Sequence, residues 1–79
     1  MLEDILEQFQ EDDFLTADGF NEAVIGVDEA SKRIIYSVAT CIEILARSMT
    51  REEAIEHFEF NVQGAYMGEK TPIWCWDML

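Results

Sequence analysis

The sequence predicts a small α+β domain, in which helices pack on a three-stranded, mainly antiparallel sheet. Two β-branched runs separated by a short polar segment indicate a hairpin. Two apolar stripes at helical spacing follow, each behind a hydroxyl residue that can cap a helix. A short aromatic run after Pro72 supplies the third strand. The predicted order is therefore helix, strand, strand, helix, helix, strand.

The length indicates one domain, residues 1–79, near the lower limit for a chain that buries its own core. An apolar fraction of 49% is ordinary for a globular protein. We divide the chain into an acidic amphipathic helix (1–10), an acidic loop (11–22) and a body of hairpin, two helices and final strand (23–77). A domain of this size has a net stability of roughly 3–5 kcal/mol, so a second subunit would help it.

The N-terminal helix is predicted by one apolar stripe at i, i+3, i+4 and i+7: Leu2, Ile5, Leu6 and Phe9. Its repulsive acidic tail favours only weak docking. A turn signal follows in Thr16-Ala-Asp-Gly19. We expect an ordered loop held by three apolar side chains: Phe14, Leu15 and Phe20.

The hairpin is predicted from Ala23–Val27 and Arg33–Tyr36, with a polar loop of about five residues between them. Neighbouring apolar residues in each run point to opposite faces, so both faces of the sheet are expected to meet apolar material. Gly26 in mid-strand indicates a bulge or a close backbone approach.

Cap signals mark both later helices. Ser37 is the expected N-cap of a helix that runs to about Ser48, with Glu43 and Arg47 paired on its surface. Thr50 caps the next helix, and Glu53 completes a capping box.

Beyond Pro72, alternation predicts that Trp74 and Trp76 share one face of the last strand, with one packed in the core and one at an interface.

The charge is concentrated in the first part of the chain. The net charge is −12, and residues 1–29 hold ten acids and no Lys or Arg. Such a field repels nucleic acid and anionic lipid and attracts basic proteins. We therefore expect a host protein with a basic surface as partner, and neither direct nucleic-acid binding nor membrane binding.

The two cysteines have no metal-ligand spacing, so we expect free thiols. The acidic start with spaced apolar residues does not have the pattern of a signal peptide, so we expect the protein in the host cell cytoplasm. No residue set has the pattern of a catalytic centre, a metal site or a cofactor site. The lone His57 has only Glu53 and Asn61 one turn away, so we interpret it as a surface residue and not as a catalyst.

The segment 53–73 resembles a group of small uncharacterised proteins encoded by bacteriophages and related mobile elements. The shared pattern is close to EAI-E-Y-F-x-F-N-x-x-G-A-Y-x-G-E-x-T-P-I, and this chain has Phe58-Glu-Phe-Asn61, Gly64-Ala-Tyr66, Gly68-Glu69 and Thr71-Pro-Ile73. His57 stands where an aromatic residue is more usual. The resemblance implies a phage origin and carries no settled activity.

The candidate site residues are therefore partner-binding ones, and none is catalytic or metal-binding. The acidic candidates are Glu11, Asp12, Asp13 and Asp18. The candidates in the family-like segment and the last strand are Asn61, Tyr66, Glu69, Lys70, Trp74 and Trp76. Asn61 is expected to bond to turn backbone.

The leading interpretation is a non-enzymatic protein that inhibits or redirects a host defence or nucleic-acid-handling protein, with imitation of DNA charge as one variant. One alternative is a homodimeric or larger structural subunit, or an acidic antitoxin. Another is a protein that sequesters a small molecule such as a nucleotide, which needs the five bases gathered around a pocket.

Overall fold

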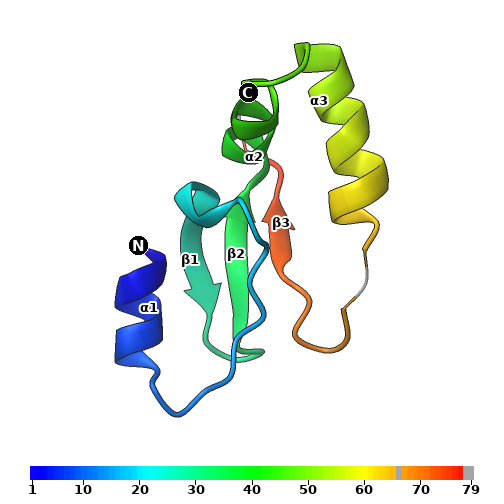
Figure 1. Cartoon of the computed structure of the whole chain (residues 1–79). Coiled ribbons are helices and arrows are strands. Elements are labelled where there is room, and N and C mark those ends of the chain that lie inside the picture. The colour runs from blue at the N-terminus through cyan, green and yellow to red at the C-terminus, as the bar shows by residue number, and fades with distance from the viewer. Residues whose placement is uncertain (66, 78–79) are drawn as a thin grey trace.

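The structure is a computed structural model, which describes residues 1–65 and 67–77 (Figure 1). It confirms the α+β class and the predicted order of helices and strands. In chain order the elements are α1 (Leu2–Gln8), the 3-10 helix η1 (Asn21–Ala23), β1 (Val24–Asp28), β2 (Arg33–Ser37), α2 (Val38–Leu45), α3 (Arg51–His57), the π-helical η2 (Phe58–Gln63) and β3 (Ile73–Cys75).

The sheet has the order β1-β2-β3 and is mixed. β1 and β2 are antiparallel, with a shift in register between Val24 and Gly26 that confirms the predicted irregularity. β3 pairs with β2 in parallel, with Ile73 opposite Ile35. The sequence predicted a mainly antiparallel sheet. The two helices between β2 and β3 form the long connection that a parallel pair requires.

Side-chain caps start α2 and α3, as predicted. Ser37 Oγ accepts a hydrogen bond of 3.1 Å from the Thr40 N–H. Thr50 and Glu53 form the reciprocal capping box, with bonds of 3.2 and 3.1 Å. α2 ends at Leu45, three residues before the predicted Ser48, because residues after it continue as turns.

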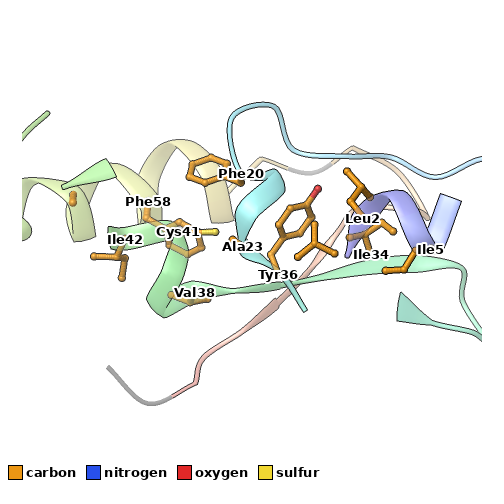
Figure 2. Packing of buried hydrophobic residues seen from close by; sticks show 12 residues of the cluster. Leu2, Ile5, Phe20, Ala23, Ile34, Tyr36, Val38, Cys41, Ile42 and Phe58 are labelled. Atoms are coloured by element: carbon orange, nitrogen blue, oxygen red, sulfur yellow. The ribbon is translucent and has the colours of Figure 1, made fainter. Parts of the chain in front are cut away.

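The core lies on one face of the sheet. In Figure 2, Leu2 and Ile5 of α1 lie on the same side of β2 as Ile34 and Tyr36. The N-terminal helix therefore docks on the domain through two buried side chains. Among the predicted loop anchors, Phe20 is buried and Phe14 partly buried, but Leu15 is 38% exposed. The prediction for Leu15 is wrong because only one of two neighbouring loop side chains reaches the core.

Tyr36 of β2 holds the acidic loop, residues 11–22, by a hydrogen bond. Its ring is fully buried, and its hydroxyl oxygen accepts a hydrogen bond of 2.7 Å from the Ala17 N–H. The loop backbone thus has a partner inside the domain, nineteen positions along the chain. This bond holds the 11–22 segment over the sheet.

The other face of the sheet is not covered in the same way. Ile25 is 44% exposed, and Ile35 and Ile73 are only partly buried. Among residues 1–65 and 67–77, this face is therefore less covered than the core face, and the prediction that both faces meet apolar material is met only in part. The covering elements α1 and η1 lie on the core side with Leu2, Ile5 and Ala23 (Figure 2).

Candidate protein-binding face

The predicted acidic candidates contact two of the chain's own lysines. Lys32 Nζ lies 3.7 Å from Asp12 Oδ2 and 4.8 Å from the centroid of the Phe9 ring. Lys70 Nζ donates a hydrogen bond of 2.8 Å to the backbone oxygen of Asp13. The structure thus brings Lys70, another predicted site residue, to the backbone of Asp13, whereas Asp12 lies beside Lys32. Glu11 and Asp18 are exposed.

A third basic side chain also contacts the acidic segment. Arg47 Nη2 donates to Glu22 Oε2 at 3.0 Å, and this hydrogen bond lowers the pKa of Glu22. The predicted partner Glu43 acts on Arg47 only as a nearby favourable charge, and the close ion pair goes to Glu22. η1 packs beside α2 and offers Arg47 a carboxylate from another element. Three of the five bases are thus engaged with residues 1–29.

The five bases are spread over separate parts of the fold. Arg33 Nε donates to the Thr71 backbone oxygen at 2.6 Å, and Arg51 is exposed at the first position of α3. The gathered basic pocket that a nucleotide-sequestering protein needs is not formed by these residues within one chain.

The turn that precedes β3, residues 67–71, is ordered by hydrogen bonds of Thr71. Thr71 Oγ1 accepts from the Met67 N–H at 2.8 Å and donates to the Gly68 oxygen at 2.7 Å. Gly68 has a φ of 100°, which favours glycine. Glu69 is exposed on this turn. The predicted site residue Tyr66 lies outside the described residues.

The two tryptophans have different environments. Trp74 packs on Tyr36 and Phe58, with ring centroids 5.1 and 5.4 Å apart. Its Nε1 is buried without a hydrogen-bond partner among residues 1–65 and 67–77. Trp76 follows the end of β3, meets Phe58 edge-on at 6.0 Å and is 50% exposed. Core packing of one tryptophan is thus observed, and an interface role for Trp76 stays a prediction.

A surface that sequence reasoning missed runs along α3 and η2. It is a shallow groove of about 470 Å³. We call it the acidic–aromatic face, and define it by Met49, Glu53, Glu56, His57, Phe60 and Asn61. Among the predicted site residues, only Asn61 belongs to it. The prediction that Asn61 bonds to turn backbone is wrong, because its Nδ2 lies 3.4 Å from His57 Nδ1.

Phe60 is the most exposed large apolar side chain of this face. It is 75% exposed, whereas Phe58, two residues earlier, is fully buried. Both belong to η2, a π-helical turn of a kind frequently found at functional positions. The sequence did carry a signal. Two phenylalanines two positions apart cannot share one face of a helix, so one of them has to point outward.

The chemistry of the acidic–aromatic face suits a cation. The Thr50 N–H donates to the Glu53 carboxylate, and this hydrogen bond lowers the pKa of Glu53. Glu56 is exposed beside it and carries a second negative charge. An ammonium or guanidinium group could contact these carboxylates and the Phe60 ring together.

The buried thiol of Cys41 is expected to react slowly. Cys41 is fully buried, and burial raises its pKa to about 12, so it stays protonated at neutral pH.

Within residues 1–65 and 67–77, no three His, Cys, Asp or Glu side chains come together as a metal-binding group. No helix in this part of the chain is long and apolar enough to cross a membrane.

No protein family, curated protein or solved structure matches this chain in the comparisons. The resemblance to bacteriophage-encoded proteins therefore stays a prediction from the residues that carry it.

Proposed function

We propose that this protein binds a basic segment of another protein at the acidic–aromatic face, and thereby blocks or redirects that protein. The observation that carries the proposal is Phe60, an aromatic side chain that is 75% exposed in a groove with ionised carboxylates. An exposed aromatic residue of this kind is a typical anchor of a protein interface.

The energetics favour a partner that brings both an apolar and a basic group. Full burial of a Phe side chain contributes roughly 1.5–3 kcal/mol. A cation above the ring adds about 0.5–1 kcal/mol at an exposed site. These contributions support a moderate affinity, because association also costs translational and rotational freedom.

The charge of the whole chain supports the same kind of partner. A net charge of −12 speeds the approach of a basic protein and slows that of an acidic one. Glu52 and Glu59 are exposed on the same helical stretch as Glu53 and Glu56. The resemblance to phage-encoded proteins supports a host protein as the target.

We favour Phe60 as the aromatic anchor of binding over imitation of DNA charge by the acidic residues of the first 29 positions. Within residues 1–29, the carboxylates of Asp12 and Glu22 already have a basic partner from the chain itself, and Lys70 bonds to the backbone oxygen of Asp13. Those contacts reduce the free charge that a DNA-like surface would present. The two variants of the proposal predict opposite results for the same pair of mutants.

The test is capture of basic proteins from bacterial lysate by immobilised protein in 50 and 500 mM NaCl. We expect a basic protein to be captured at low salt, and to be lost with Phe60→Ala and at high salt. Leu15→Ala is the matched control, because Leu15 is an exposed apolar residue of the loop, outside this face.

A protein with four neutralised acidic residues distinguishes binding through the aromatic anchor from imitation of DNA charge. If Glu11, Asp12, Asp13 and Asp18 are changed to their amides and capture persists, the acidic loop is not the binding surface. Full capture by Phe60→Ala together with loss in the neutralised protein would overturn the anchor and favour charge imitation. Backbone NMR shifts with a Lys/Arg-rich amphipathic peptide then locate the contact directly.

A further inference from the structure

We propose that the basic segment bound at the acidic–aromatic face is an amphipathic helix with a defined residue pattern. Its contact side carries apolar residues at positions i and i+11, and Arg or Lys at positions i+4 and i+7. This inference rests on the function proposed above, and it names the class of segment that the same face binds.

The face presents one row of side chains with apolar ends and an acidic middle. In chain order the row consists of Met49, Glu53, Glu56 and Phe60, at intervals of four, three and four residues. Side chains at such intervals lie on one side of a helix. The row begins just before the N-cap of α3 and follows that helix into η2.

The row lies on the side of α3 that faces away from the core. Glu53, Glu56 and Phe60 are exposed, whereas Ala54 and Phe58 between them are fully buried. α3 and the start of η2 therefore pack on the domain with one side, and leave the row accessible on the other. A helix side with an exposed aromatic residue is suited to docking another helix.

The two carboxylates of the row lack a basic partner within residues 1–65 and 67–77. The close ion pairs of this part of the chain lie elsewhere, between Lys32 and Asp12 and between Arg47 and Glu22. Glu53 and Glu56 are three positions apart on one helix, so their charges repel each other. A basic side chain between them would replace this repulsion by attraction, which a neutral or acidic partner cannot do.

The repeat of the row favours a helix over an extended segment as the partner. Side chains on one side of a helix recur about every 5.4 Å along its axis, and a second helix has the same repeat. An extended strand has a side chain on one side about every 6.6 Å, so it falls out of step with the row within three repeats. The groove of about 470 Å³ is shallow and therefore takes up side chains of the partner helix, not its backbone.

The row then determines the pattern of the partner. Apolar partner residues face Met49 and Phe60, and basic ones face Glu53 and Glu56. The intervals of four, three and four read the same in both directions, so the pattern holds for a parallel or an antiparallel partner. The four partner positions fall within about 60° of one another around their own helix, so all four can contact the row at once.

The test is fluorescence anisotropy of labelled peptides in 50 mM NaCl. Each peptide has about 20 residues in an Ala/Gln background, because shorter isolated helices are marginal in water. The matched peptide has Leu at i and i+11, and Arg at i+4 and i+7. The second peptide has the same composition, but its two Arg are moved to i+2 and i+9 on the opposite side of the helix. The third has Pro at i+6, which breaks the helix.

We expect the matched peptide to bind about tenfold more tightly than either of the others, since each of them loses the contacts to both carboxylates or the helix that presents them. Glu56→Gln should weaken the matched peptide about threefold and leave the peptide with moved Arg unchanged. Glu56 is preferred to Glu53 for this test because Glu53 also caps α3. Glu29→Gln is the matched control, since it removes the same charge at an exposed site outside the face and should leave both peptides unchanged.

The outcomes separate this inference from the function on which it rests. If the matched peptide and the peptide with moved Arg bind equally, and Phe60→Ala abolishes both, the face is a binding site but the pattern is wrong. Equal binding of the Pro peptide would mean that the partner is not a helix. No binding of any peptide at about 1 mM, or binding that Phe60→Ala leaves unchanged, would overturn the proposed function and this inference together.

Discussion

The Ser37 hydroxyl donates a hydrogen bond of 2.5 Å to Asp77 Oδ2, which ties the start of α2 to the segment after β3. Asp77 Oδ1 also accepts from the Ala39 N–H at 3.0 Å. The first turn of α2 therefore has a side-chain acceptor from Ser37 and another from Asp77. The carboxylate also faces the positive end of the helix dipole.

Replacing Asp77 by alanine is expected to destabilise the fold. Loss of a helix cap typically costs about 1 kcal/mol. In a domain of this size that lowers the melting temperature by roughly 4–8 °C. Thermal denaturation followed by circular dichroism measures the change. Glu11→Gln, which removes one exposed negative charge, should leave the melting temperature nearly unchanged.

The Asp77 contribution should depend on pH in a defined direction. The hydrogen bond from Ser37 lowers the pKa of Asp77 below its ordinary value of 3.8. The carboxylate is therefore stabilising above pH 3.8, and the contribution is lost as pH falls through the lowered pKa. Melting curves from pH 7 to pH 2 should converge for the wild type and Asp77→Ala. A constant difference down to pH 2 would contradict this linkage.

Substitution by alanine should destabilise the fold strongly at Phe58 and hardly at all at Phe60. Phe58→Ala removes the ring that Trp74 and Trp76 pack against, at a cost of about 3–5 kcal/mol. That equals the whole stability expected of such a domain, so the variant should be largely unfolded at 25 °C. Phe60→Ala should change the free energy of unfolding by less than about 0.5 kcal/mol. Urea denaturation compares the two variants.

Tyr36→Phe tests the bond that holds the acidic loop. The substitution leaves the Ala17 N–H without its acceptor, which costs about 1–3 kcal/mol. Hydrogen exchange at Ala17 should accelerate more than exchange within α2. Equal protection of Ala17 in both proteins would show that the hydroxyl does not hold the loop.

The two cysteines should differ in reactivity. Cys41 is fully buried with a pKa raised to about 12, whereas Cys75 is partly exposed. Iodoacetamide at pH 8 should therefore modify Cys75 first, and Cys41 only after denaturation. Peptide mapping by mass spectrometry gives the order. Early modification of Cys41 would mean that α2 opens readily.

Local signals explain why most of the fold could be predicted. Ser37 and Thr50 act on backbone groups three positions away, and Gly26 disturbs the strand that contains it. Each of these effects depends on neighbours in sequence. The element order follows from such signals together with the period of the apolar residues.

The contacts that could not be predicted join distant segments. Arg47 has Glu43 one turn away, yet it pairs with Glu22, twenty-five positions earlier. The choice depends on where η1 lies beside α2, and no local pattern contains that information. The same holds for Lys70, which reaches the backbone of Asp13.

The candidate site was predicted least well, because its central residue looks like a core residue in the sequence. Phe60 is apolar, aromatic and two positions from Phe58, so composition alone groups the two together. Only the helical angle between them separates a buried ring from an exposed one.

The parallel pairing of β3 also sets an order of folding events. β1 and β2 can pair as soon as their short loop closes, whereas Ile35 meets Ile73 only across 38 positions of chain (35 to 73). Non-local pairs of this kind form slowly, because the connecting segment must be ordered first. β3 should therefore join the sheet after α2 and α3 have packed. It should also be the first strand to detach under mild denaturant, before the rest of the domain unfolds.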